Sequence, residues 1–354
     1  MDPKYPHLNL RDWPFQIVAS PSTAQVWIGR NDFLKRLRML ERSARRVPSS
    51  QVVLLWASFG SGKSHALLYL QHLAMKNEDL IPLYVVIPEG VRSFLDVYRA
   101  IVDSALESNA AAAAGRWLFE TGETVPGSDV ERALTRIAVY GEEESTTASA
   151  WLRGDKVPMK DLRQIGIGSR IESTPEAITA LNKLIQIMQK KGQRKVLLLL
   201  DEVQELVDLG KKLSECVGAL HKIFDQNTVG LTMVLSFTTA LQQSLHGILG
   251  GALSDRASMT LTLPPLASDE AVRFVEELIE FWSVDPSKSP YPFSRATLKS
   301  VISELENRAA PLTPRSVIKA FNQILREAEQ EIEEGRMGTI KPEFALGNIP
   351  EDLN

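Results

Sequence analysis

The glycine-rich segment ASFGSGKS, residues 57–64, limits the fold of this chain more than any other part of its sequence. It follows an apolar run and precedes a helical run, so the pattern predicts a strand, a loop and a helix in succession. Gly60 and Gly62 allow the loop to curl until its N–H groups point at phosphate oxygens, and the helix adds its positive N-terminal end. Lys63 is expected to reach the β- and γ-phosphates of a nucleotide, and the Ser64 hydroxyl to ligate magnesium.

The residues of this segment that we expect to contact the nucleotide are Ser58, Phe59, Gly60, Ser61, Gly62, Lys63, Ser64 and His65. Packing inside the helix explains His65 as well, because it follows the serine directly and lies in an apolar stretch. Ala57 stands where such loops usually have their first glycine, which is a departure that a small residue tolerates.

Five short apolar runs predict the strands of a sheet, at 51–57, 81–87, 195–200, 231–236 and 258–263. Most are continuously apolar rather than alternating, which indicates parallel strands buried on both faces by helices. The clearest helical pattern between them is 175–191, with Ser173 and Glu176 as a capping box at its start. The predicted fold class is therefore α/β, with a three-layer parallel sheet that carries the phosphate loop.

The sequence changes character after Pro264-Pro265. Three helical stretches follow, at 268–282, 294–307 and 313–334, and no strand is predicted among them. We expect a nucleotide-binding core at 1–264, a small all-helical lid domain at 265–345 and a tail at 346–354. The core is expected to include a long helical insertion at about 91–192.

The composition is that of an ordinary globular protein. Of the 354 residues, 44% are hydrophobic and 24% are charged, and the formal net charge of −4 argues against general adhesion to nucleic acid. The single cysteine, Cys216, excludes an intramolecular disulfide and fits a reducing cytoplasm, and no thiol chemistry is expected of it. The first residues carry no export signal, and the longest uncharged run is too polar to span a membrane.

The predicted strand at 195–200 ends in two acidic residues, Asp201 and Glu202. Beside a phosphate loop, Asp201 would hold magnesium through water, and Glu202 would orient and deprotonate the attacking water. By itself, an acidic pair at a strand end could also bind the N-termini of neighbouring helices.

Together these motifs resemble the AAA+ ATPases over about residues 13–335. The phosphate loop and the Asp-Glu pair are the specific parts of the resemblance. It implies hydrolysis of ATP with Mg²⁺ as cofactor, at the interfaces of an oligomer.

The resemblance also implies roles for residues outside these two motifs. Ile28 and Arg30, in the segment Trp27-Ile28-Gly29-Arg30, match the residues that pass the adenine and brace the loop, although a simple turn explains them too. Thr238, after the fourth predicted strand, matches the polar sensor of the γ-phosphate, a role for which Ser236 and Thr239 compete.

Two arginines match further parts of the family pattern. Arg256 stands where the family has an arginine finger that acts on the nucleotide of a neighbouring subunit, the alternative being a surface pair with Asp255. Arg315 begins a predicted helix with Thr313 as N-cap and Pro314 at the first position, and it matches the second sensor, which binds phosphate within its own subunit.

Within the AAA+ proteins the sequence is most similar to the origin-recognition and initiator ATPases and to ATP-binding proteins of the BREX phage-defence type. This similarity rests on three groups of segments: Asp12-Trp13-Pro14-Phe15; Asp255-Arg256 with Leu263-Pro264-Pro265-Leu266; and, in the insertion, Trp151-Leu152-Arg153-Gly154 with Leu162-Arg163-Gln164-Ile165-Gly166-Ile167. The initiators carry a winged-helix DNA-binding domain after the lid. Few residues follow the last predicted long helix here, so we do not expect this domain, which weakens an origin-binding role.

The segment 30–46 contains seven basic residues against Asp32 and Glu41. It can follow a phosphate backbone, but Leu34, Leu37 and Leu40 also make it an ordinary amphipathic helix with a solvated basic face.

The expected function is ATP hydrolysis that drives assembly or remodelling of a DNA-associated complex. The alternative is an ATP-gated scaffold with slow turnover that recruits an effector in a phage-defence or mobile-element system. The expected partners are further copies of this chain and a protein effector; contact with DNA stays open, and contact with a membrane is not expected.

Overall fold

The structure, a computed structural model, describes residues 3–18, 20, 23–123, 128–238, 253–308 and 311–353. The chain forms two compact units. One combines residues 1–36, 57–69 and 263–354, and the other combines residues 37–56 and 70–262. None of the described helices is both long and apolar enough to cross a membrane.

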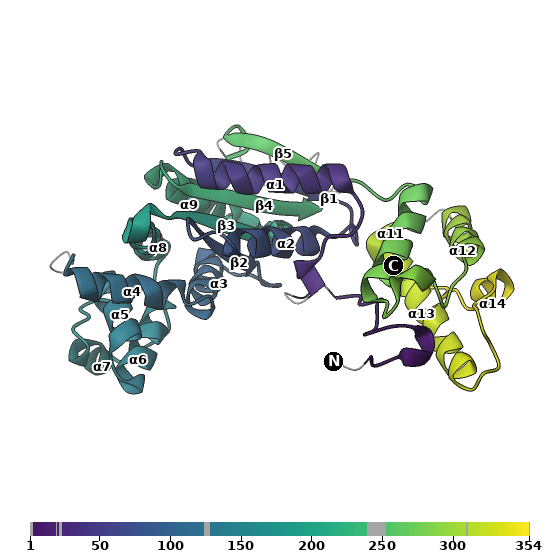
Figure 1. The fold of residues 1–354 in the computed structure, drawn as a ribbon. Coiled ribbons are helices and arrows are strands. Elements are labelled where there is room, and N and C mark those ends of the chain that lie inside the picture. Colours follow the sequence, from purple (N-terminus) through teal and green to yellow (C-terminus); the bar gives the residue numbers. More distant parts are fainter. Residues whose placement is uncertain are drawn as a thin grey trace. The chain divides into compact units, whose positions relative to one another are not determined.

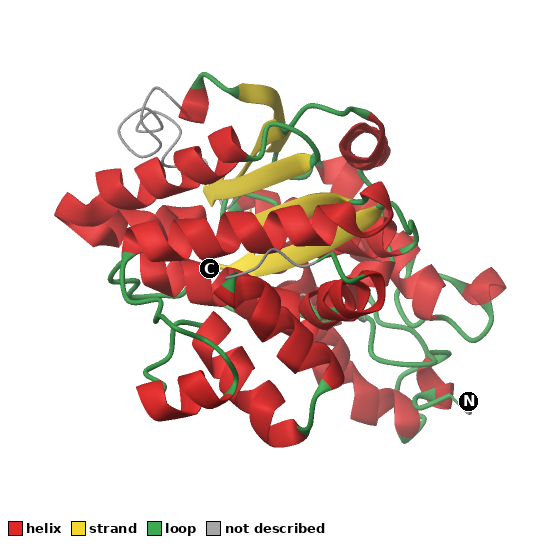
Figure 2. Ribbon diagram, turned by 90° about the vertical axis from the view of Figure 1, so that its left-hand side faces the viewer, coloured by secondary structure: helices red, strands yellow, loops and turns green. Residues whose placement is uncertain are grey.

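A five-stranded sheet forms the centre of the second unit (Figures 1 and 2). The strand order is β2-β3-β4-β1-β5, and the strands are β1 (Gln51–Ala57), β2 (Leu80–Val86), β3 (Lys195–Asp201), β4 (Leu231–Thr238) and β5 (Ala257–Leu263). β3 pairs in parallel with β2 and with β4. Every residue of β1 is buried, as its continuous apolar pattern predicts. The predicted P-loop fold class with a parallel sheet is confirmed.

Helices connect and cover the strands. They are α1 (Asn31–Arg46), α2 (Lys63–Met75), α3 (Phe94–Glu107), α8 (Thr174–Lys190) and α9 (Leu213–Gln226), and a 3₁₀ segment, η4 (Val203–Lys212), follows β3. α8 begins with the predicted capping box, in which Ser173 and Glu176 satisfy each other's backbone N–H groups.

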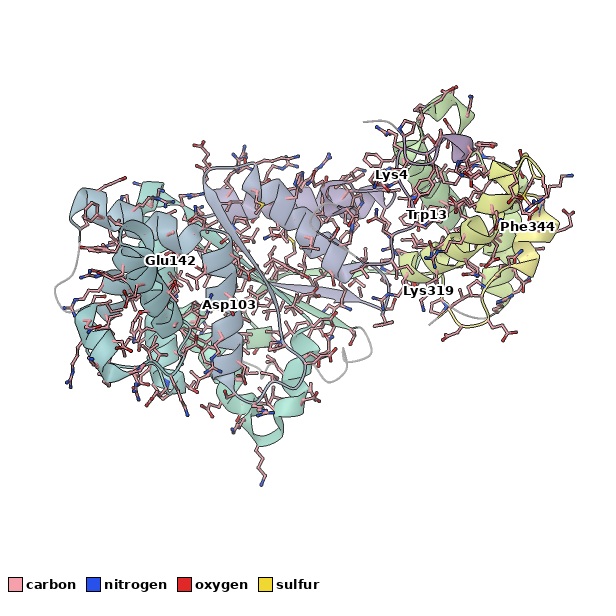
Figure 3. All side chains as sticks on the ribbon, turned by 90° about the horizontal axis from the view of Figure 1, so that it is seen from below. Lys4, Trp13, Asp103, Glu142, Lys319 and Phe344 are labelled. Atoms are coloured by element: carbon pink, nitrogen blue, oxygen red, sulfur yellow. The ribbon has the colours of Figure 1, made fainter. Side chains whose placement is uncertain are left out.

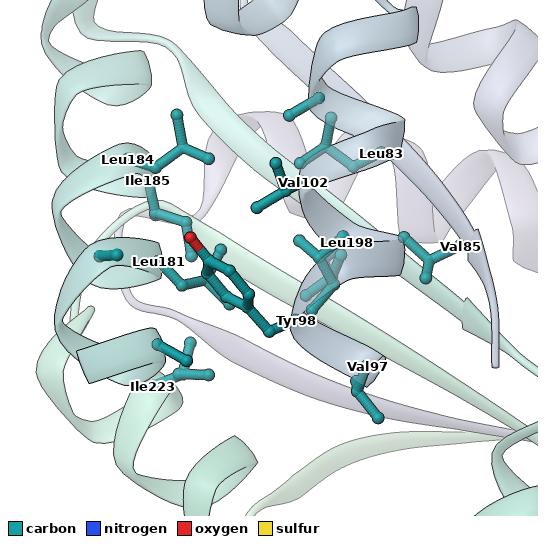
Figure 4. Packing of buried hydrophobic residues seen from close by; sticks show 14 of the residues in the cluster. Leu83, Val85, Val97, Tyr98, Val102, Leu181, Leu184, Ile185, Leu198 and Ile223 are labelled. Atoms are coloured by element: carbon teal, nitrogen blue, oxygen red, sulfur yellow. The ribbon is translucent and has the colours of Figure 1, made fainter. Parts of the chain in front are cut away.

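The predicted insertion between β2 and β3 is helical. Beside α3 and α8 it contains α4 (Ala110–Thr121), α5 (Asp129–Val139), α6 (Glu142–Leu152) and α7 (Met159–Gln164), which gather next to α3 and α8 (Figure 1). Tyr98 of α3 is fully buried against Leu181 and Ile185 of α8 and against β3 (Figure 4). Its hydroxyl donates to the backbone oxygen of Leu152 at 2.5 Å, and Arg153 pairs with Asp103 (labelled in Figure 3), so the insertion is joined to α3.

The first unit has its own apolar core, made by both ends of the chain. Its helices are α11 (Ser268–Trp282), α12 (Arg295–Asn307), α13 (Pro314–Glu333) and α14 (Pro342–Gly347). The first three agree with the predicted stretches, and α14 was not predicted. Leu8, Leu10 and Phe15 from the N-terminal segment belong to the same core, and Trp13 (Figure 3) donates to Asn322 of α13 at 2.7 Å.

Candidate nucleotide-binding site

The phosphate loop leaves β1 at Ala57 and enters α2 at Lys63. Gly60 and Gly62 have φ angles of +74° and +96°, a region that favours glycine and turns successive N–H groups toward one side. The Ser61 N–H donates to the Ser58 oxygen at 3.1 Å, which closes the loop, and the two serine hydroxyls contact each other. The loop therefore has the curled backbone that its sequence predicts.

Lys63 is the residue of the loop whose charge needs a partner. It is only 6% exposed, and its ammonium forms no ion pair with a carboxylate among the residues that the structure describes. A buried charge without a partner is costly. A phosphate group held by the loop would supply the missing negative charge.

Arg30 braces the loop from the segment that precedes α1. Its guanidinium donates to the backbone oxygens of Ser61 at 2.7 Å and of Pro264 at 2.6 Å. Burial lowers the pKa of Arg30 to about 10, so the side chain stays charged at neutral pH. The neighbouring Ile28 is half-buried.

His65 and Trp27 fasten the same segment to the start of α2. The Nε2 atom of His65 lies 3.0 Å from the Val26 oxygen, and burial lowers the pKa of its imidazole. The Trp27 ring stacks on Phe33 and packs against His65 and Tyr69. These contacts give His65 a packing role in this structure.

Arg315 lies against the phosphate loop, within the same unit. Thr313 caps α13 by accepting from the Ser316 N–H at 3.1 Å, as predicted. The Arg315 N–H donates to the Gly60 oxygen at 3.2 Å, and its guanidinium carbon lies 4.4 Å from the centre of the Phe59 ring. A Cβ atom at Gly60 would come within 2.9 Å of the Arg315 Cβ, so only glycine permits this close approach.

The acidic pair closes β3 in the other unit. Asp201 is 1% exposed and accepts three hydrogen bonds, from the Tyr84 hydroxyl at 3.0 Å, the Ser236 hydroxyl at 2.9 Å and the Glu202 N–H at 3.0 Å. All three donors are neutral, and no basic side chain of the described residues pairs with this carboxylate. Glu202 takes a left-handed conformation with φ of 55°, and its side chain accepts from Gln204.

Sequence reasoning missed Tyr84 and Gln204 as partners of the acidic pair. Tyr84 is opposite Leu199 in the parallel register of β2 and β3, two residues before the strand ends. A lone polar residue in an otherwise apolar strand is a signal, but its partner follows only from the strand order.

Among the three sensor candidates, the Ser236 hydroxyl is already bound to Asp201. Thr238 is half-buried at the end of β4, and Thr239 lies outside the described residues.

Arg256 immediately precedes β5. It forms an ion pair with Asp225 of α9 instead of the neighbouring Asp255 that the sequence suggested as an alternative, and it lies 5.9 Å from the Phe224 ring. Its side chain is 44% exposed, so a second partner can still reach it.

The described parts of the chain do not support a separate metal site or a reactive thiol. No group of three or more histidine, cysteine or acidic residues there can hold a metal ion by itself. Cys216 is buried in α9, and burial raises the pKa of its thiol to about 12, which keeps it protonated and unreactive.

Comparison with known proteins identifies the family. The profile of the family described as BREX system ATP-binding protein BrxC/D matches residues 103–341, which is more than half of the chain. The chain belongs to this family. The match begins after the phosphate loop, so the loop is an observation independent of it. No curated protein matches the sequence.

Solved structures of initiator proteins are similar in fold. The Aeropyrum pernix ORC2 protein, solved as ADPNP-ADP complexes, has a TM-score of 0.58 at 14% identity, covering 95% of this chain and 70% of that one. Cdc6p from Pyrobaculum aerophilum has a TM-score of 0.52 at 13% identity, covering 96% and 73%. A chain of Drosophila ORC bound to DNA has a TM-score of 0.56 at 13% identity, covering 96% and 64%. The predicted resemblance to initiator-like and BREX-type AAA+ proteins is confirmed, and family members are ATP-binding proteins.

Proposed function

We propose that the protein hydrolyses ATP at interfaces between its own copies and uses the cycle to assemble or remodel a DNA-associated complex. The observation that carries the ATP part is the buried Lys63 ammonium, which has no carboxylate partner among the described residues and stands at the end of a loop curled by positive φ angles at Gly60 and Gly62. This is a donor set for the β- and γ-phosphates of a nucleotide.

In the proposed mechanism, the Ser64 hydroxyl would ligate Mg²⁺ and Asp201 would hold it through water; the bound ion would supply positive charge beside the β- and γ-phosphates. The residues fit this ion, since the Asp201 carboxylate accepts from three neutral donors and its Oδ2 atom accepts only from Tyr84 among the described residues. Glu202 orients the attacking water and takes its proton, and Thr238 binds the γ-phosphate or that water. Arg315 binds phosphate within its own subunit, Ile28 borders the adenine, Arg30 braces the phosphate loop, and Arg256 serves the neighbouring subunit.

The functional division that we propose is a core at 1–264, a lid at 265–345 and a tail at 346–354, in a cytoplasmic protein. Association with DNA is supported by the similar fold of the Drosophila ORC chain, whose structure contains DNA. A protein effector is the second proposed partner.

The steady-state rate of ATP hydrolysis with and without duplex DNA tests this function. We expect Mg²⁺-dependent hydrolysis that DNA stimulates. Slow turnover that is indifferent to DNA would instead favour an ATP-gated scaffold that recruits an effector, and absence of nucleotide binding would refute both.

A further inference from the structure

Two basic segments that are far apart in the sequence meet at the amino-terminal ends of the strands. One is the end of α1, with Arg42 and Arg46, and the other runs from the end of α8 into β3, with Lys190, Lys191, Arg194 and Lys195. These six residues are called the basic edge below. All of them belong to the second unit.

Hydrogen bonds hold the two segments together around the loop 227–230. The Lys195 ammonium donates to the Val47 oxygen at 2.8 Å, just past the end of α1. The Gly230 N–H donates to the Pro48 oxygen at 2.9 Å, and the Gln189 amide donates to the Val229 oxygen at 3.1 Å. The basic edge is therefore one continuous surface, although the sequence separates its halves by more than 140 residues.

The positive charge of the basic edge is not cancelled locally. The acidic groups Glu41 and Asp79 both pair with Arg45, which is not part of the edge. Arg194 donates to backbone oxygens of Glu78 and Leu80, and none of the six residues forms an ion pair with a carboxylate among those described, although Asp79 attracts Lys195 at longer range. Basic residues also stabilise helix C-termini, but two helix ends supply only about one negative charge between them, since each carries roughly half a charge. Most of the six charges remain in excess.

The chemistry of the surface favours a polyanion over a protein partner. The segments 42–50, 186–195 and 227–230 contain no aromatic residue, and their exposed large hydrophobic residues are Val47 and Val229. Protein interfaces depend on buried aromatic and aliphatic anchors, whereas binding to a phosphate backbone needs only positive charge and N–H donors. Arg42 and Arg46 are one helical turn apart and exposed, so two guanidinium groups lie on one face of α1.

We propose that the basic edge binds the phosphate backbone of a duplex nucleic acid. Binding there is independent of base sequence and dependent on salt. The basic edge would be the DNA-binding surface of the proposed function, and its binding to a duplex does not depend on ATP hydrolysis.

The test compares two triple variants that remove the same charge. R46A/K190A/K191A removes one arginine and two lysines from the basic edge, and K156A/K160A/R163A removes the same residue types from exposed positions on and before α7. Binding of a fluorescent 30-base-pair duplex of arbitrary sequence is followed by anisotropy over a range of salt concentrations, with DNA and RNA duplexes as separate arms.

Each lost phosphate contact should reduce the slope of log K against log salt by about 0.9 and, at 0.1 M salt, the affinity by about eightfold. We expect the basic-edge variant to bind at least ~10-fold more weakly with a shallower slope, and the control variant to bind within about twofold of the wild type. R46K/K190R/K191R, which keeps the charge, should bind like the wild type. The DNA and RNA arms show which duplex the surface prefers.

Equal losses in both triple variants, an unchanged slope or no binding by the wild type would overturn the proposal. Loss of self-association by the basic-edge variant alone in sedimentation, with duplex binding retained, would assign the surface to a second copy instead. ATP hydrolysis without DNA should be unchanged in this variant, so a failure of the basic edge is distinguishable from a failure of the proposed ATPase.

Discussion

At the scale of single residues, the environments of Lys63 and Asp201 differ in a way that suits their proposed roles. The Lys63 ammonium is buried without a carboxylate partner among the described residues, whereas three neutral donors hold the Asp201 carboxylate. In the proposed roles, Lys63 would receive a phosphate as its anionic partner, and Asp201 would hold a magnesium ion.

Replacing Lys63 with alanine should remove nucleotide binding or weaken it at least ~100-fold, because a charge-assisted contact to phosphate of about 3 kcal/mol or more is lost. Calorimetric titration with ATP measures this directly. Lys76→Ala, at an exposed position just past α2, is the matched control and should leave the affinity unchanged. An unchanged affinity in Lys63→Ala would refute the phosphate-loop assignment.

Replacing Glu202 with glutamine should preserve ATP binding but slow hydrolysis by about 10²–10⁴, since the water loses its base while Asp201 stays in place. Single-turnover hydrolysis of radiolabelled ATP, alongside its binding constant, separates the two effects. Glu205→Gln, three residues further along the same acidic stretch, is expected to hydrolyse ATP normally. Wild-type turnover in Glu202→Gln would exclude Glu202 as the base.

At the scale of secondary-structure elements, two close backbone approaches depend on glycine. One is the contact of α13 with the phosphate loop at Gly60, described above. The other is the crossing of α4 and α5, where a Cβ atom at Gly115 would lie 1.9 Å from the Leu134 oxygen. The insertion therefore packs at a separation that a side chain at this position would not allow.

Gly115→Ala should destabilise the protein by about 1–3 kcal/mol, because the overlap forces α4 and α5 apart. Gly218→Ala, in the middle of α9 with open space around the missing Cβ, should instead be neutral or stabilise by about 0.5–1 kcal/mol. Urea unfolding of both variants measures the difference. Equal stability of the two variants would show that the α4–α5 crossing is looser than described.

At the scale of the whole molecule, Arg256 and the basic edge are two separate sites proposed to contact different partners. Arg256 precedes β5 and is bound to Asp225, and the basic edge gathers residues from α1, α8 and β3. Arg256 is proposed to act in a neighbouring copy, and the basic edge on a nucleic acid. The first proposal requires an oligomer, and the second does not.

Arg256→Ala should leave the ATP affinity of a single subunit intact while abolishing most turnover, since arginine fingers contribute about 10³–10⁵ in rate where they have been measured. Mixing it with Lys63→Ala should restore partial hydrolysis, because some interfaces then combine an intact pocket with an intact finger. Hydrolysis by the mixture is compared with that of each variant alone. A mixture that assembles but stays inactive would mean that Arg256 only pairs with Asp225.

The sequence by itself determined the elements and the motifs that they carry. Continuous apolar runs predicted the strands to within two residues at each end, and the caps at Ser173 and Thr313 were predicted correctly, because both are patterns of residues near in sequence. The AAA+ assignment rested on the phosphate loop and the Asp-Glu pair, which are also local patterns.

Only the tertiary structure decided which distant residues meet. The hydrogen bond from Tyr84 to Asp201 depends on the pairing of β2 with β3, and the contact of Arg315 with Phe59 depends on the approach of α13 to the loop. The pairing of Arg256 with Asp225 depends on the end of α9 meeting the residue before β5. The basic edge arises in the same way. The spacing of residues in the sequence does not predict these contacts, because many strand orders and helix packings satisfy the same local preferences. Burial of the apolar core selects one arrangement among them.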